Sequence, residues 1–220
     1  MSRLILSVSL LALIACGCDD NGNSQSISQT STQSKPIVSI VPVIDNTKND
    51  VDWNLSDELS SMLYSRIAQK NHLHLVDSSH VRAKTKKLSD KNNPFGADIT
   101  WTKQSFQGDD FVVFLELIEH EEVLNQNKRS PTDPSNCSAN INISMRVRVL
   151  DVRGEEPRVI LQELVHNSHS VARQFTQINF FQVPWGDPSY SISPMGLAHE
   201  EFTKEVSSRI EDYILTMSKK

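Results

Sequence analysis

Residues 140–149 alternate between apolar and polar side chains more regularly than any other stretch of the chain. One set of positions holds Ile141, Ile143, Met145, Val147 and Val149, and the other holds Asn140, Asn142, Ser144, Arg146 and Arg148. Successive side chains of a strand point to opposite faces, so this pattern predicts a long strand with one face on a core and one in water. The turn-forming residues 153–157 and the following stretch 158–172 predict the partner strand of an antiparallel hairpin.

The rest of the chain predicts helices packed on this sheet. Residues 36–44 (PIVSIVPVI) form a β-branched run typical of a buried strand, which Pro42 should end or confine to an edge. Residues 54–71 predict a helix capped by Asn54, 72–77 a strand, 78–92 a polar helix or loop, 111–118 a strand, 173–197 an irregular aromatic loop, and 198–217 an amphipathic helix. The expected fold is a single α/β sandwich domain on a mixed sheet with a long antiparallel hairpin.

The first eighteen residues have the layout of a secretory signal. Arg3 precedes an apolar run from Leu4 to Leu13, which is too short to span a bilayer, and small residues follow. The sequence Leu13-Ile14-Ala15-Cys16 resembles the bacterial lipobox, which implies that Cys16 becomes an N-palmitoyl, S-diacylglyceryl cysteine at the start of the mature protein. The alternative is a hydrophobic first strand or helix, which the polar stretch after Cys18 disfavours.

Three segments are therefore expected. Residues 1–15 form a signal peptide, residues 16–35 a lipidated start followed by a disordered Ser-, Thr-, Gln- and Asn-rich tether, and residues 36–220 the α/β domain. The chain has 22 basic and 27 acidic residues, a balance that argues against a nucleic-acid partner. Its three cysteines form no Cys-x-x-Cys pair, so no metal and no cofactor are expected. Whether Cys18 and Cys137 form a disulfide stays open.

The start of the globular part has a recognisable pattern. It reads IVSIVPVIDNT, NLSDELSSMLYSRIAQKN and HLHLVD: a strand, a Pro, Asp-Asn-Thr, a helix and a strand ending in Val-Asp. It resembles envelope lipoproteins related to the curli secretion lipoprotein, the lipoprotein activator of a peptidoglycan synthase, and the amino-terminal domain of the Tol-Pal β-propeller protein. Gly96-Ala97-Asp98 before FVVFLEL resembles their Gly-Ala-Asp segment, although about a dozen residues intervene here. The whole chain also resembles small uncharacterised lipoproteins of chlamydial bacteria.

This resemblance covers residues 37–118 and implies an α/β sandwich that contacts partners or assembles in the envelope. It transfers no catalytic residue. The aromatic residues Phe180, Phe181, Trp185 and Tyr190 are candidates for a partner-binding patch, because aromatic side chains dominate interface hot spots. The alternative is that they pack into the domain.

Candidate chemical groups are few. His72 and His74 have a spacing that some metal sites use, but a solvated strand face is the favoured interpretation, and His166 and His169 should point to opposite faces. The segment His120-Glu121-Glu122, with Glu116 and Glu119, offers carboxylates for acid–base chemistry, against the favoured interpretation of an exposed, charged strand end. The chain is not expected to be an enzyme.

The predicted function is that of a lipid-anchored envelope protein facing the periplasm. Gly17 after Cys16 favours the outer membrane over the inner membrane. The α/β domain would be a non-catalytic module that binds other envelope proteins or the peptidoglycan-synthesis machinery. Two alternatives remain: a subunit of a homo-oligomeric envelope assembly and, third, a hydrolase or metal-binding enzyme.

Overall fold

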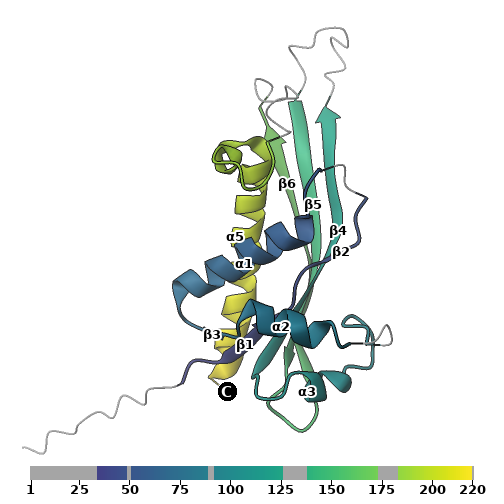
Figure 1. Ribbon diagram of the computed structural model, residues 1–220, viewed down its shortest axis with the longest axis vertical. Coiled ribbons are helices and arrows are strands. Elements are labelled where there is room, and N and C mark those ends of the chain that lie inside the picture. Colours follow the sequence, from purple (N-terminus) through teal and green to yellow (C-terminus); the bar gives the residue numbers. More distant parts are fainter. Residues whose placement is uncertain (1–33, 49–50, 89–91, 126–137, 173–182, 220) are drawn as a thin grey trace, which may run out of the picture. The chain divides into compact units, whose positions relative to one another are not determined.

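A mixed sheet of six strands organises the domain in the computed structural model, which describes residues 34–48, 51–88, 92–125, 138–172 and 183–219 (Figure 1). The strands are β1 (Ile37–Ile40), β2 (Ile44–Asp45), β3 (His74–Leu75), β4 (Phe111–Asn125), β5 (Ser138–Asp151) and β6 (Arg158–Val171). Their order is β3-β1-β4-β5-β6, and β2 also pairs with β4. β1 runs parallel to β3 and β4, whereas β4, β5 and β6 are antiparallel. The predicted single α/β domain with a mixed sheet and a long hairpin is confirmed.

Helices cover both faces of the sheet to different extents. α1 (Leu55–Lys70) and α5 (Pro194–Ser218) pack with one face around a large apolar core. α2 (Ser78–Thr85) and α3 (Trp101–Ser105) belong to a smaller core on the other face, which includes Val81, Phe106 and Phe114. The predicted inward positions of β5, from Ile141 to Val149, are at most 1 % exposed. None of the helices in the described ranges is long and apolar enough to cross a membrane.

The two ends of α1 follow from its sequence. Asn54 caps the start, since its side-chain oxygen accepts a hydrogen bond from the backbone N–H of Asp57 at 3.0 Å, as predicted. Asn71 ends the helix in the left-handed conformation, with φ of 56°. Asparagine tolerates this conformation better than most residues other than glycine.

Pro42 interrupts the strand as predicted, and α1 stabilises the interruption. β1 pairs with the start of β4 and β2 with its middle, so they lie along the same side of β4 with a break at residues 41–43. In that break the backbone N–H of Val43 donates to the hydroxyl of Ser60 at 2.8 Å, while the hydroxyl of Ser56 donates to the Val43 carbonyl. Two serines of one helix thus satisfy backbone groups that no strand pairs.

A β-bulge divides β4, which the sequence predicted only as far as residue 118. Leu117 lies opposite Met145 and Glu119 lies opposite Ser144, so Ile118 is an extra residue in the strand. Because strand side chains alternate, this one residue exchanges the two faces for everything that follows. Glu119 therefore lies with Ser144 on the face away from α5, and His120 points toward α5, where it contacts His199.

Other boundaries differ from the sequence-based expectation. α5 begins at Pro194, four positions before the expected Ala198, and a 3-10 helix, η3 (Tyr190–Ile192), precedes it. Arg148 was expected to face water but is only 7 % exposed, because residues 94–96 cover it and its guanidinium donates to the carbonyls of Pro94 and Gly96. The prediction of a fully solvated face was wrong at this end of the sheet.

Candidate functional site

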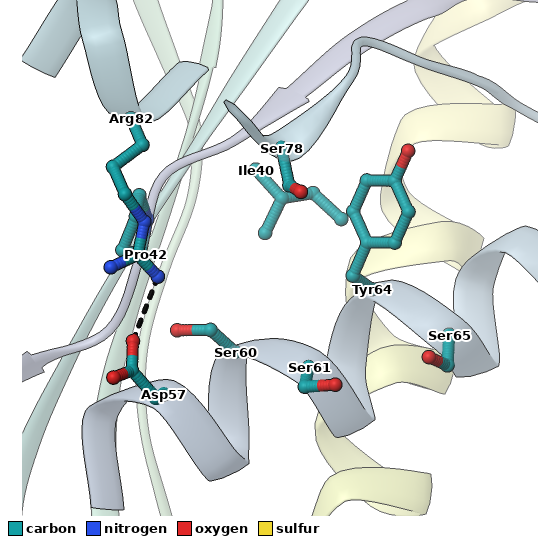
Figure 2. A pocket seen from close by; sticks show the side chains of 9 residues that line it. All are labelled: Ile40, Pro42, Asp57, Ser60, Ser61, Tyr64, Ser65, Ser78 and Arg82. Atoms are coloured by element: carbon teal, nitrogen blue, oxygen red, sulfur yellow. Dashed lines mark hydrogen bonds and ion pairs between the residues drawn. The ribbon is translucent and has the colours of Figure 1, made fainter. Parts of the chain in front are cut away.

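A polar groove lies between α1 and the start of α2, beside the carboxyl ends of the parallel strands β1 and β3 (Figure 2). We call it the α1–α2 groove; its volume is about 160 Å³. It is lined by Ile40, Pro42, Asp57, Ser60, Ser61, Tyr64, Ser65, Ser78 and Arg82. Carboxyl ends of parallel strands are a common location for ligand sites in open α/β sheets.

The sequence of α1 explains how one helix serves both the core and this groove. Leu55, Leu59, Leu63 and Ile67 form the buried stripe. The groove residues Asp57, Ser61 and Tyr64 recur at spacings of four and three on another face, so they stack along one side of the helix. Figure 2 shows the Tyr64 ring projecting from α1 toward the chain around Ser78.

An ion pair between the two helices closes one end of the groove. A guanidinium nitrogen of Arg82 lies 2.8 Å from a carboxylate oxygen of Asp57, and the side chains are 50 % and 38 % exposed. A partly exposed pair of this kind contributes only about 0–1 kcal/mol to stability. A ligand that offers hydrogen bonds to both groups can therefore separate or bridge them at little cost.

A second set of polar groups lies in the core, and we call Trp53, Glu58, His120, Tyr190 and His199 the polar core cluster. Glu58 and His199 are fully buried, Tyr190 is 6 % exposed and His120 is 8 % exposed. A carboxylate oxygen of Glu58 lies 2.7 Å from Nδ1 of His199 and accepts a hydrogen bond from the Tyr190 hydroxyl. The other oxygen accepts from Trp53 Nε1 at 2.7 Å. The cluster joins α1, β4, η3 and α5.

The two imidazoles of the cluster share one hydrogen bond, with 2.8 Å between Nε2 of His120 and Nε2 of His199. One ring must donate and the other accept, so both cannot be fully protonated in this arrangement. Burial is the main cause that lowers the pKa of His120 to about 4, and the charge of His199 adds to it. Hydrogen bonding and the charge of His199 hold the pKa of Glu58 below its ordinary value despite burial. The cluster thus combines an ionised Glu58 with a neutral His120.

The structure tests only some of the residues proposed from the sequence. Cys16, Phe180 and Phe181 lie outside the described residues. Trp185 is 38 % exposed and remains available to a partner. Tyr190 is not on the surface: it packs edge-on against Trp53, with ring centroids 5.8 Å apart, and belongs to the polar core cluster.

The two histidines of each candidate pair have different surroundings and do not form a shared site. His72 lies before β3 and its Nδ1 is 2.9 Å from the buried Glu211, while His74 is exposed on β3. His166 and His169 contact different carboxylates, those of Glu119 and Glu201. Within the described ranges, no three His, Cys, Asp or Glu side chains are grouped to hold a metal ion.

The proposed carboxylate group around residue 120 divides between the two faces of the sheet. His120 is buried in the cluster, whereas Glu119 bonds to Ser144 on the other face and Glu116 pairs with Arg146 at 3.0 Å. The prediction of an exposed strand end was therefore wrong for His120, because it did not include the bulge. Sequence reasoning also missed Glu58 and His199, whose signal was present: each is a polar residue inside an apolar helical stripe.

The comparisons with known proteins identify a family and a fold. A family model described as "Family of unknown function (DUF7499)" matches residues 24–218. A hypothetical protein from Chlamydia trachomatis has a similar structure, with a TM-score of 0.64 and 24 % identity, over 82 % of this chain and 98 % of that chain. No curated protein matches the sequence.

Two bacterial lipoproteins are more distant structural neighbours. Lipoprotein GNA1162 from Neisseria meningitidis matches with a TM-score of 0.38 and 10 % identity, over 66 % of this chain and 88 % of that chain. A minor lipoprotein from Acinetobacter baumannii matches with a TM-score of 0.39 and 9 % identity, over 80 % and 91 %. The chlamydial structure supports the fold, and at these lower scores the two lipoproteins add no argument about it.

Proposed function

We propose that this chain, which belongs to the family of unknown function DUF7499, is a lipid-anchored protein of the bacterial cell envelope with a non-catalytic binding domain. The observation that carries the proposal is the sequence Leu13-Ile14-Ala15-Cys16 at the end of a short apolar run. Two or more acyl chains on Cys16 would anchor the protein stably. Gly17 at the second mature position favours the outer membrane, with the domain facing the periplasm.

The domain would bind through surfaces that the fold leaves open. The α1–α2 groove is one such surface, and the exposed ring of Trp185 is another. The partners we propose are other envelope proteins or components of peptidoglycan synthesis. The resemblance of the segment from IVSIVPVIDNT to HLHLVD to the curli-type and synthase-activator lipoproteins favours these partners.

Metabolic labelling tests the anchor. The full-length chain is expressed in a Gram-negative host that is fed an alkyne fatty acid, and the labelled protein is detected after coupling to a fluorophore. We expect labelling of the natural chain and of Cys18→Ser, and none of Cys16→Ser. Labelling lost only in Cys18→Ser would move the anchor to Cys18, and an unlabelled natural chain in a host that labels its own lipoproteins would refute the proposal.

Cross-linking in native envelopes tests the binding role. The amount of partner captured by the natural chain is compared with that captured by Trp185→Ala, whose exposed ring can be removed without disturbing the core. We expect specific envelope proteins to be recovered and at least one of them to be lost from the variant. Recovery of self-links alone would instead support the assembly alternative.

One structural observation favours self-assembly as a second candidate function. β6 is 14 residues long and ends the strand order, so no strand among the described residues pairs with its outer edge. Its Leu164 is 64 % exposed. Long free edges pair readily with other chains, and lysine on an edge opposes this. Light scattering of Leu164→Lys beside the natural chain tests it: a natural oligomer that the variant dissociates supports assembly, and a monomeric natural chain excludes it.

A further inference from the structure

The α1–α2 groove carries hydroxyl groups that form no hydrogen bond to the residues the structure describes. The side chains of Ser61, Tyr64, Ser65 and Ser78 line it without a hydrogen-bond partner among the described residues. Ser60 differs, because its hydroxyl already serves Val43 and Ser56. A hydroxyl both donates and accepts, so such a lining matches a ligand whose own groups do both.

The charges of the groove argue against an ionic ligand. Among the described residues that line it, Asp57 and Arg82 are the charged ones; they form an ion pair, and their formal charges cancel. An anion drawn to Arg82 would meet the carboxylate of Asp57 within a few ångströms, and a cation drawn to Asp57 would meet Arg82. As a pair they offer an acceptor and a donor side by side, which fits adjacent hydroxyls of a neutral molecule.

The apolar parts of the groove favour a ring with a hydrocarbon face. Ile40 and Pro42 form its base, and the Tyr64 ring stands beside it (Figure 2). At about 160 Å³ the groove is smaller than the roughly 300–1,000 Å³ pockets that hold drug-sized ligands. Its size therefore suits a single small ring.

We propose that the α1–α2 groove binds one neutral pyranose unit of a glycan, with the sugar hydroxyls on the serines and on the Asp57–Arg82 pair and a C–H face against Tyr64. The inference deepens the proposed binding function and rests on it only for the location of the protein in the cell envelope. Two sources share this chemistry, a glycan of N-acetylated amino sugars and a glycan of plain hexoses.

NMR tests the proposal on the full-length chain purified in detergent, with chitotriose, cellotriose and inorganic phosphate as three separate probes; saturation transfer detects the saccharides, and broadening of the phosphorus signal detects phosphate. We expect transfer to at least one saccharide, with a dissociation constant obtained by titration, and no broadening of the phosphate signal. Preference for chitotriose assigns the amino-sugar source, and preference for cellotriose assigns the hexose source. Binding of phosphate alone, or of none of the three, overturns the proposal.

Variants locate the binding. Ser61→Leu fills the groove from an exposed position, and Tyr64→Phe removes one hydroxyl while keeping the ring. We expect at least about a tenfold weaker saccharide affinity for the first, the equivalent of about 1.4 kcal/mol, and a smaller loss for the second. Tyr213→Phe, on α5 and outside the groove lining, is the matched control and should bind normally.

Unchanged affinity in Ser61→Leu would place the saccharide elsewhere and refute the groove assignment. The labelling experiment on Cys16 separates this failure from that of the proposed function. A lipidated envelope protein that binds no saccharide leaves the anchor proposal intact, whereas saccharide binding by an unlabelled chain leaves the groove proposal intact.

Discussion

Lowering the pH from 7 to 4.5 is expected to remove about 2.5 kcal/mol of unfolding free energy through His120. Burial lowers the pKa of this imidazole from 6.5 to about 4, and His199 adds to the effect, while Glu58 and Asp45 oppose it. In the unfolded chain the pKa returns to about 6.5. Between the two values the unfolded state binds a proton that the folded state does not.

The sign and the size follow from that difference. The stability contributed by neutral His120 is complete above pH 6.5 and falls as the pH approaches 4. Each pH unit within this interval is equivalent to about 1.4 kcal/mol, and about two units lie between pH 6.5 and 4.5. The lowered pKa of Glu58 places the loss of its contribution below its unfolded value of 4.5, so this interval largely isolates the histidine.

Urea unfolding followed by tryptophan fluorescence measures the effect on a chain that lacks residues 1–16. The chain has three tryptophans, and one of them, Trp53, contacts Glu58 and Tyr190, so part of the signal comes from the cluster itself. His120→Gln keeps a neutral donor for His199 and should be less sensitive to pH by about 2.5 kcal/mol over this interval. His80→Gln removes an exposed histidine of α2 and should behave like the natural chain. Equal losses in the natural chain and in His120→Gln would refute the reasoning.

Three further predictions concern stability, measured by urea unfolding at pH 7. Glu58→Ala should cost about 3–5 kcal/mol, because it leaves buried donors of the polar core cluster unpaired, and Glu58→Gln should cost less; equal losses would show that the carboxylate charge has no role. Gly196→Ala should cost about 2–3 kcal/mol, because an added Cβ would overlap the carbonyl oxygen of Tyr190; a neutral result would mean that η3 moves freely. Asn54→Ala should cost about 1 kcal/mol through the lost cap, whereas Asn54→Asp should keep most of it.

The sequence predicted those parts of the fold whose determinants are local. The inward apolar positions of residues 141–149, the helix after Asn54 and the cap at Asn54 each depend on residues within a few turns or strand positions, and each is confirmed. Pro42 also interrupts its strand as its missing N–H requires.

The remaining features depend on partners far along the chain. Arg148 is buried because residues 94–96 fold over it, more than fifty positions away in sequence. The polar core cluster joins Glu58 to His199 across 141 positions, and no local pattern contains that contact. The α1–α2 groove likewise requires the second helix to be placed, although the serines that line it are visible in the sequence of α1.

The extra residue in β4 changes which positions of the strand face each side of the sheet. Before Ile118 the odd-numbered residues of β4 face the large apolar core with α1 and α5, and after it the even-numbered residues point to that side. Deleting Ile118 would remove the bulge and leave Glu119 opposite Ser144 and His120 opposite Ile143, so His120 would stay in the interior. A regular strand that kept Ile118 would instead pair Ile118 with Ser144 and Glu119 with Ile143, and would turn Glu119 rather than His120 toward His199. The composition of the core beside His199 therefore depends on the bulge as much as on the residues of the strand.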